Sequence, residues 1–353
     1  PAEEIEMVVA SSRAAWQVDA ADFPVGSPVE EVLRFSLRYA VLAPSSHNSQ
    51  PWRFWIDGEA VELYVDLSRR LPVVDPADRE LVMSCAAALK NLTVALNYFG
   101  EGFAVRPFPE PDRVNLLARL DLVSGSAAAA PHVKDLFAAI IRRHTTRRTF
   151  DPAAVTEEVF LDLRRAALDD QAGFFEVPRH KQRAVANLVA DADTVQMSDP
   201  QFRRELAHWM RPNHPATADG MPGYALGYSE LQSVVGPLVV RTFDVGSSQA
   251  ARDEDLVRGS PLLAVLATPG DDPASWLAAG QAMQHVLLTA TAGGLQASFL
   301  NQPIEVPALR AKLASELGLT GYPQLLMRFG YGQAGSATPR RPVSDVLLQS
   351  RPA

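Results

Sequence analysis

Three short segments of the chain gather hydrogen-bonding or cationic side chains outside the periodic patterns of helices and strands. The first is PSSHNSQP at 44–51, in which six consecutive polar residues lie between two prolines. A solvated loop, whose Ser and Asn side chains bond to their own backbone, is the ordinary interpretation of such a stretch. The density of donors and acceptors between two rigid residues instead suits a polar heterocycle with several ring nitrogens and carbonyls.

The other two segments are basic and favour a bound phosphate. RHTTRR spans 143–148, and PRRP spans 339–342. In an extended loop alternate side chains point the same way, so Arg143, Thr145 and Arg147 are expected to converge. Two guanidinium groups and a hydroxyl are good ligands for a phosphate that carries about −1.5 to −2 charges. A solvated basic turn is the alternative for each segment, but two of them in a chain of net charge −8 suggest an anion site.

Together the three segments predict a phosphorylated aromatic cofactor with one terminal phosphate. No GxGxxG motif follows a predicted strand, so the pyrophosphate site of a dinucleotide-binding fold is not indicated. The P-loop pattern GxxxxGK[ST] does not occur either. FMN therefore fits these residues better than a dinucleotide does.

Metal and thiol chemistry are not predicted. The seven histidines never pair as HxxxH or HxH, and one cysteine cannot build a thiolate site. Cys85 lies in an apolar helical stretch, where a small buried side chain is the expected role.

The length and composition predict a globular protein of two domain-sized units. At 353 residues the chain exceeds the roughly 150 of one ordinary domain, and 47% of its residues are hydrophobic. The negative net charge argues against binding of nucleic acid, which needs a basic face. No apolar run approaches the roughly 18 residues of a membrane span, so no membrane association is expected.

The predicted compartment is the cytoplasm. A single cysteine cannot form an intrachain disulfide, which favours a reducing environment. The first ten residues carry three acidic side chains and no basic one, unlike the start of a targeting leader. A processed chain from which a leader has been removed is the alternative.

Hydrophobic periodicity places the polar segments between regular elements. A helix with one apolar face leads into the first segment, and a strand pair joined at Asp57-Gly58 follows it. Nearly apolar helices at 77–99 and 273–292 are expected at the centre of the molecule. The other expected elements are helices at 29–41, 132–142, 156–168 and 309–317, helical patterns up to about Met210, and strands at 52–56, 61–65, 103–108, 173–177, 261–268 and 324–332.

Two segments lack such periodicity. Small residues at 124–131 form the best candidate for a linker, and residues 211–259 are expected to be irregular because they are rich in Pro, Gly and Tyr. Long irregular stretches inside a compact domain usually serve as lids or binding loops. A lid insertion is therefore predicted at about 211–259.

The order of the elements suggests an internal repeat. A nearly apolar helix that ends at Gly100 precedes a strand and Pro107, and the same order recurs around Gly294 and Pro303. Any two helix–strand units look this similar, so a chance likeness is the alternative. If the repeat is real, the chain consists of two copies of one fold that pack as a dimer would.

The polar segments resemble those of a known family. APSSHNSQPWRF at 43–54 is similar to the ring-binding segment of the FMN-dependent nitroreductase superfamily, and RHTTR resembles its phosphate motif, Arg-x-Ser/Thr-x-Arg/Lys. NQPIE at 301–305 is similar to the family's PIE segment, and PRRP to its C-terminal phosphate contact. The first segment is specific, whereas the other three carry weight only together.

The order of these segments differs from that of ordinary members, which are much shorter and form dimers with the flavin at the interface. In those chains the phosphate motif comes first, whereas here it follows the ring-binding segment by about 95 residues. The chain thus resembles the Acg-type proteins, in which two copies are fused into a pseudo-dimer with a lid. Such a chain keeps one flavin site of the original two.

The resemblance implies an α+β fold, a nitroreductase-like α/β/α sandwich with fused copies at 1–130 and 131–353 and the lid in the second. Phe150 stands one residue later than usual, so the register of Arg147 against Arg148 stays open. Trp209, Tyr224 and Tyr228 are candidates to cover the ring. The implied cofactor-binding residues are Pro44, Ser45, Ser46, Asn48, Pro303, Ile304 and Glu305 for the ring, and Arg143, Thr145, Arg147, Arg340 and Arg341 for the phosphate.

The implied function is that of an oxidoreductase, in which hydride passes from NAD(P)H through FMN to a nitro compound, quinone or similar small acceptor. A non-enzymatic FMN storage protein, whose lid blocks the nicotinamide, is the alternative. A two-domain protein without flavin is a third interpretation. A monomer, because the pseudo-dimer is internal, or a weak homodimer is expected.

Overall fold

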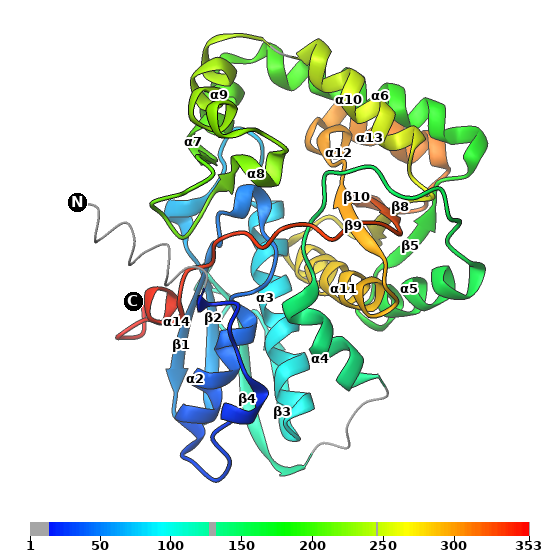
Figure 1. Ribbon diagram of the computed structural model, residues 1–353. Helices are drawn as coiled ribbons and strands as arrows, with labels where there is room; N and C mark the ends of the chain where they lie inside the picture. The colour runs from blue at the N-terminus through cyan, green and yellow to red at the C-terminus, as the bar shows by residue number, and fades with distance from the viewer. Residues whose placement is uncertain (1–13, 127–131, 245, 353) are drawn as a thin grey trace.

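Two four-stranded antiparallel sheets organise the protein, as the computed structural model shows for residues 14–126, 132–244 and 246–352 (Figure 1). The first sheet has the order β1-β2-β4-β3, and the second has the order β5-β8-β10-β9. The strands are β1 (Trp52–Asp57), β2 (Ala60–Val65), β3 (Glu101–Pro107), β4 (Leu116–Ser126), β5 (Gly173–Glu176), β8 (Leu262–Thr268), β9 (Gln296–Phe299) and β10 (Tyr322–Gly330).

The two sheets share one topology, so the repeat suggested by the sequence has a structural counterpart. In each sheet the fourth strand lies between the second and the third, and a long helix follows the second strand. These helices are α3 (Arg79–Tyr98) and α11 (Pro273–Ala292). Gly100 and Gly294, which follow them, both adopt a left-handed φ, of 83° and 79°. Only glycine adopts that conformation without strain.

The central helices α3 and α11 pack against each other and join the two sheets into one core. A Cβ atom on Gly280 of α11 would lie 2.3 Å from the Met83 carbonyl oxygen of α3, so this position requires glycine. A buried hydrogen bond from Gln284 Nε2 to Asn91 Oδ1, 2.6 Å long, links the two helices. The expectation of central helices at 77–99 and 273–292 is therefore confirmed.

The second half contains a long insertion between its first two strands. A short turn at 58–59 joins β1 to β2, whereas residues 177–261 separate β5 from β8. This stretch forms α6 (Arg179–Ser198), α7 (Pro200–Trp209), β6 (Met210–Arg211), β7 (Met221–Pro222), α8 (Gly223–Leu226), α9 (Glu230–Thr242) and α10 (Gly246–Arg258). The expectation of irregular chain at 211–259 is thus wrong for much of its length, because α8, α9 and α10 are helical there.

Strand β4 is an element that the sequence patterns did not predict. It begins at Leu116 and continues to Ser126, so it includes the start of the expected linker at 124–131. The rest of that linker and the first ten residues, which bore on a leader, lie outside the described residues. The remaining elements are η1 (Ala20–Asp22), α2 (Val29–Ala40), η2 (Ser46–Asn48), η3 (Leu67–Arg69), α4 (Val133–Arg142), α5 (Glu157–Asp169), α12 (Gln302–Glu305), α13 (Pro307–Leu317) and α14 (Val343–Val346).

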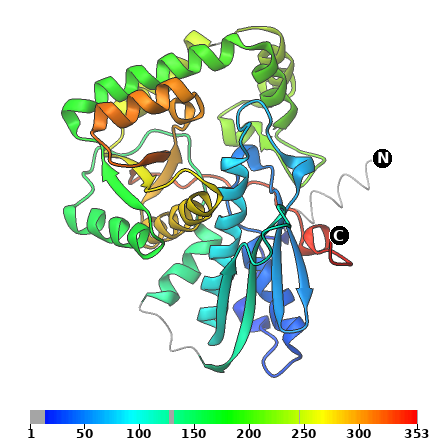
Figure 2. The ribbon, with the colours of Figure 1, turned by 180° about the vertical axis from the view of Figure 1, so that it is seen from behind.

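Two segments add parallel bridges at the edges of the sheets, and one of them crosses between the sheets. After β10 the C-terminal chain, red in Figures 1 and 2, runs from the second sheet to the first, where Leu347 forms a parallel bridge with Phe54 of β1. We call residues 332–342 of this chain the C-terminal strap. The chain after α4 forms a parallel bridge with β9 through Thr145 and Ala297. Within the described ranges, no helix is both long enough and apolar enough to cross a membrane.

Candidate functional site

The loop that contains the first polar segment is strained. His47, Asn48 and Gln50 all have left-handed φ values, of 53°, 54° and 52°. Such conformations are costly for residues other than glycine and persist where the surroundings enforce them, often at functional sites. Ser45 is one of the groups that hold this loop, because its Oγ accepts a hydrogen bond of 2.9 Å from the Gln50 amide.

Asn48 and Gln50 tie this loop to the insertion and to the C-terminal strap. Asn48 Nδ2 donates to the carbonyl oxygens of Gly220, at 2.9 Å, and Pro339, at 3.1 Å. Gln50 Nε2 donates to the Ala218 carbonyl oxygen at 2.7 Å. The structure thus joins segments from both halves at one place.

A pair of buried arginines lies beside this loop. Arg143 is 3% exposed and Arg340 is 2% exposed, and each donates from Nη2 to the Leu42 carbonyl oxygen at 3.4 Å. Arg340 Nη1 also donates to Asn48 Oδ1 at 2.8 Å. The structure therefore brings together the first polar segment, the first basic segment and PRRP, as the sequence predicted.

These two charges lack a counter-ion within the part of the chain that the structure describes. Neither guanidinium forms an ion pair with a carboxylate of the described residues, and the Nε atom of each is buried without a hydrogen-bond partner. Burial lowers the pKa of Arg143 to about 10, and burial together with the charge of Arg143 lowers that of Arg340 to about 9. Because an uncompensated buried charge is costly, the pair is suited to bind an anion.

Trp16 and His144 form part of the surroundings of Arg340. The guanidinium carbon of Arg340 lies 5.0 Å from the centre of a Trp16 ring, and the Trp16 indole donates to the Thr338 carbonyl oxygen at 2.8 Å. The His144 ring meets Trp16 edge-on at 4.7 Å. Sequence reasoning missed Trp16, because no local pattern connects it with residues near the other end of the chain.

The sequence predicted that Arg143, Thr145 and Arg147 converge, and the structure gives Arg147 and Thr145 other contacts than those of Arg143. The side chain of Arg147 is exposed, and its Nη1 donates to the carbonyl oxygen of Ala225 in the insertion at 3.1 Å. Thr145 lies at the edge of the second sheet, where its bridge with Ala297 fixes the loop. Burial, and secondarily the charge of Arg147, lowers the pKa of His47 to about 4.

Arg341 points to a different environment from Arg340. Its Nη2 donates to the Asp345 carbonyl oxygen at 2.8 Å, and its Nη1 lies 4.0 Å from Asp66 Oδ2 and 3.3 Å from the Gln50 carbonyl oxygen. These contacts fasten the C-terminal strap to the first half.

The PIE segment reaches the first polar segment through a group of buried carboxyls. Ser46 Oγ donates to Glu80 Oε2 at 2.5 Å, and Gln196 Nε2 donates to Glu305 Oε2 at 2.6 Å. Burial, and secondarily the charge of Glu80, raises the pKa of Glu305 well above its usual range. Pro303 and Ile304 are buried next to Glu305 in the chain. Pro44, the first residue of the first polar segment, is also buried. Glu80 was not identified from the sequence, because a single acid in an apolar helix gives no signal.

Arg328 binds backbone carbonyl groups of the RHTTRR loop and was also not identified from the sequence. It is fully buried in β10, and its Nη2 donates to the carbonyl oxygens of Arg148, at 2.9 Å, and Thr146, at 3.3 Å. Its guanidinium carbon lies 4.4 Å from the centre of the Phe150 ring. The alternation of side chains along β10 places Arg328 on the face of the second sheet that packs against α6 and α10. Its contact with the loop therefore depends on the register of β10.

The aromatic candidates of the insertion take different positions. Trp209 is 6% exposed and packs in an apolar cluster with Leu71 and Val74, so ordinary packing accounts for it. Tyr224 donates from its hydroxyl to the Ala337 carbonyl oxygen at 2.8 Å, which joins the insertion to the C-terminal strap. Tyr228 packs against the same apolar cluster as Trp209.

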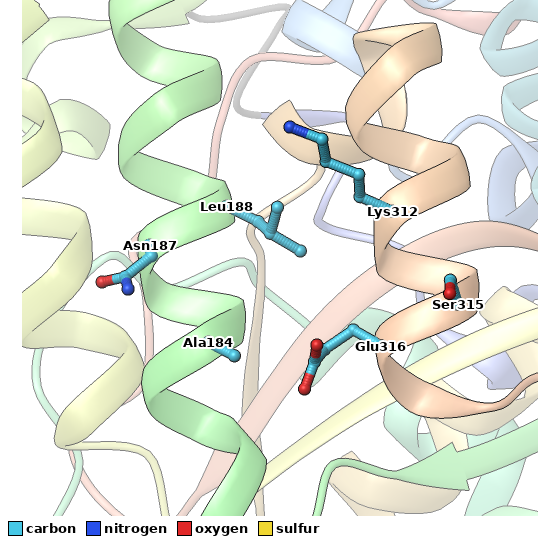
Figure 3. Close-up of a pocket in the computed structure, with 6 residues that line it drawn as sticks. All are labelled: Ala184, Asn187, Leu188, Lys312, Ser315 and Glu316. Carbon is cyan, nitrogen blue, oxygen red and sulfur yellow. The ribbon is translucent and has the colours of Figure 1, made fainter.

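Three other features of the described residues stand apart from this site. The Cys85 thiol is buried and its pKa is raised well above the usual range by burial, as expected for a packing residue. No group of three or more potential ligands in the described ranges could hold a metal. A groove of about 340 Å³ between α6 and α13, drawn in Figure 3, contains none of the candidate residues. It is lined by Ala184, Asn187, Leu188, Lys312, Ser315 and Glu316.

The chain belongs to the Nitroreductase family, whose model matches residues 140–331, and its fold is nitroreductase-like. It is 34% identical to "Putative NAD(P)H nitroreductase Rv3131" of Mycobacterium tuberculosis, over 91% of this chain and 92% of that protein. It is 29% identical to "Putative NAD(P)H nitroreductase acg" of the same organism, over 90% of this chain and 95% of that protein. The crystal structure of the FMN-dependent nitroreductase NfnB from Mycobacterium smegmatis in complex with NADPH superposes with a TM-score of 0.41 and 18% identity. That superposition covers 62% of this chain and 99% of NfnB.

Proposed function

We propose that this protein is an FMN-dependent oxidoreductase that uses NAD(P)H to reduce a nitro compound, quinone or similar small acceptor. The observation that carries the proposal is the pair Arg143 and Arg340, buried beside the strained 46–50 loop without a counter-ion among the described residues. A terminal phosphate supplies the anion that these charges lack. Membership of the Nitroreductase family supports FMN as the cofactor that carries this phosphate.

The remaining residues have separate roles in this proposal. Ser45, whose Oγ already accepts from Gln50, has its hydroxyl hydrogen available for a phosphate oxygen. Thr145 fixes the first basic segment, while Pro44, Ser46, Pro303, Ile304 and Glu305 flank the flavin ring. Asn48 positions Arg340 through its hydrogen bond, and Arg341 anchors the C-terminal strap rather than the phosphate. Arg147 contacts a part of the ligand remote from the phosphate, next to the insertion.

When bound, FMN would supply the redox chemistry, which is hydride transfer from the nicotinamide and electron transfer to the acceptor. The protein's contribution is to orient the ring and to fix charges around it. Burial, and secondarily the neighbouring Glu80, raises the pKa of Glu305, which favours the neutral form of its carboxyl beside the proposed ring site.

We further propose that the chain is a fused pseudo-dimer with one flavin site, with its halves at about 1–130 and 131–353. The identical strand orders support the two copies. The C-terminal strap crosses to the first sheet, whereas the chain after β4 leads into α4 and no crossing of that kind reaches β5 in the described residues. Only one of the two equivalent sites therefore receives both basic segments. The cytoplasm is the proposed location.

A storage protein is the second candidate, because the insertion is fastened over the site. Residues of its 212–228 part bond to both the first polar loop and the C-terminal strap, through Asn48, Gln50 and Tyr224. If these contacts persist in solution, the insertion acts as a closed lid that excludes nicotinamide. If they open, turnover is possible.

One experiment distinguishes the candidates. We expect the purified protein to show flavin absorbance and to lose it rapidly when NADPH or NADH is added without oxygen. Bleaching by dithionite alone would support storage. A colourless preparation that takes up no added FMN would contradict both.

A further inference from the structure

The helix α9 (Glu230–Thr242) presents an unusual apolar face to solvent. Six of the sixteen large hydrophobic side chains that are exposed in the described residues lie between 231 and 243. Leu231 is 73% exposed, Val234 64% and Leu238 67%, and Val235, Val239 and Phe243 are also exposed. An apolar cluster of this kind on the surface of a protein commonly marks an interface.

The spacing of these residues defines one continuous stripe. Leu231, Val234, Val235 and Leu238 follow the i, i+3, i+4, i+7 pattern, so they lie on one side of the helix. The opposite side, with Ser233 and Val240, is buried against other parts of the insertion. Figures 1 and 2 show α9 at the rim of the molecule. One side of α9 therefore packs inside the molecule, and the stripe on the other side is available to a partner.

Two charged side chains along one edge of the stripe indicate which kind of partner is complementary to it. Glu230 and Arg241 are both exposed and lie eleven residues apart, which is close to three helical turns. Both therefore project along the same edge of the stripe. The Glu230 carboxylate accepts a hydrogen bond of 3.0 Å from Asn213 Nδ2, and its side chain remains 71% exposed, so it can also meet a cation. When two copies of such a helix pack antiparallel, residues on the same edge face each other, so Glu230 of one copy meets Arg241 of the other. A two-fold axis generates this pair twice.

We propose that the partner is a second copy of this chain, and that two α9 helices pack antiparallel through the stripe 231–239 with reciprocal Glu230–Arg241 pairs. A membrane surface fits less well, because α9 carries one acid and one base and the chain has a net charge of −8. A helix of 13 residues is about 20 Å long. Its contact is small beside the roughly 1,600 Å² of a stable complex, so the dimer is expected to be weak and concentration-dependent.

Analytical ultracentrifugation of the full chain between micromolar and several hundred micromolar protein tests the proposal. We expect reversible dimerisation in this range for the wild type. Val234→Lys and Leu238→Lys should each weaken association at least 10-fold. Val195→Lys, which changes an exposed valine of α6 in the same way, should leave it unchanged. The proposal would be overturned if the wild type stayed monomeric over the whole concentration range, or if the α9 variants dimerised as tightly as the wild type.

The charge pair tests the antiparallel orientation. Glu230→Arg and Arg241→Glu should each weaken dimerisation by roughly 3-fold or more, and the double variant should recover most of that loss because the pairs are re-formed with opposite sign. Thermal unfolding of each variant separates this effect from damage to α9. A double variant that is weaker than either single one contradicts the orientation. Co-sedimentation with phosphatidylcholine vesicles, abolished by Leu238→Lys in a chain that does not dimerise, would assign the stripe to a membrane instead. None of these measurements depends on a bound flavin.

Discussion

At the scale of residues, the proposed phosphate site consists of Arg143 and Arg340. A charge-assisted hydrogen bond contributes about 1.5–3 kcal/mol, and about 1.4 kcal/mol corresponds to a factor of ten. We therefore expect the double variant Arg143→Ala, Arg340→Ala to weaken FMN binding by at least 100-fold. Fluorescence titration of the apoprotein measures this change, and circular dichroism checks that the fold survives.

The loop provides a matched control. Arg148 belongs to the same segment, but its side chain is exposed and its Nη1 donates to Gln333. Arg148→Ala should keep FMN affinity close to that of the wild type. If the double variant binds FMN normally, the phosphate is held elsewhere, and if Arg148→Ala alone loses it, the register of the phosphate motif is shifted by one residue.

At the scale of elements, the site depends on how closely α3 and α11 approach. The Cβ of Gly280→Ala would meet backbone and side-chain atoms of α3, at 2.3 Å from Met83 and 2.6 Å from Ala86. Because backbone cannot yield cheaply, we expect a loss of about 1–3 kcal/mol in the free energy of unfolding. The halves should also separate slightly, which weakens FMN binding. Urea denaturation measures the first effect.

Gly293→Ala is the control for this helix. Gly293 lies at the end of α11 with a negative φ, and a Cβ there would have only ordinary contacts at 3.6 Å. The variant should be as stable as the wild type within about 0.5 kcal/mol. Equal stability of Gly280→Ala and the wild type would mean that the helices do not pack as closely as described.

At the scale of the whole molecule, buried histidines make stability depend on pH. Burial, followed by the charges of Arg143 and Arg340, lowers the pKa of His144 to about 3. Between about pH 6.5 and pH 3, His144 is therefore protonated in the unfolded chain and neutral in the folded chain. The free energy of unfolding consequently falls as the pH drops from 6.5 toward 3. The slope is up to about 1.4 kcal/mol per pH unit for each such histidine. His47 acts in the same direction down to about pH 4.

Replacing His144 separates its contribution to the pH dependence of stability from the contributions of groups that act in the opposite direction. Burial raises the pKa of Asp75 and Asp193, and these carboxyls make stability fall in the opposite direction, as the pH rises. His144→Gln should lose less stability than the wild type between pH 6.5 and 4, as measured by urea unfolding of the ligand-free protein. His180→Gln, at an exposed position of α6, should parallel the wild type. Parallel curves for His144→Gln would show that His144 is readily protonated in the folded state.

Local patterns sufficed for most elements and for the candidate segments, because their causes are local. The alternation at 52–56 and 61–65 and the apolar periodicity of α3 and α11 come from side-chain direction within one element. β4 was missed because its start lies within a charged stretch. Helix α9 was missed because Gly236 and Pro237 interrupt its apolar run, and α10 because it is mostly polar. The packing of α10 against α6 and of α9 against α7 overrides that composition.

The sequence by itself determined the family, the three polar segments and the central helices, since each is encoded by neighbouring residues. The tertiary structure decided which arginines share one place: Arg143 meets Arg340 because the C-terminal strap crosses to the first sheet, while Arg147 and Arg341 face other partners. It also decided that Trp16, Glu80 and Arg328 belong to the site. Contacts between residues distant in the chain depend on strand register and on crossing segments, and no local spacing encodes these.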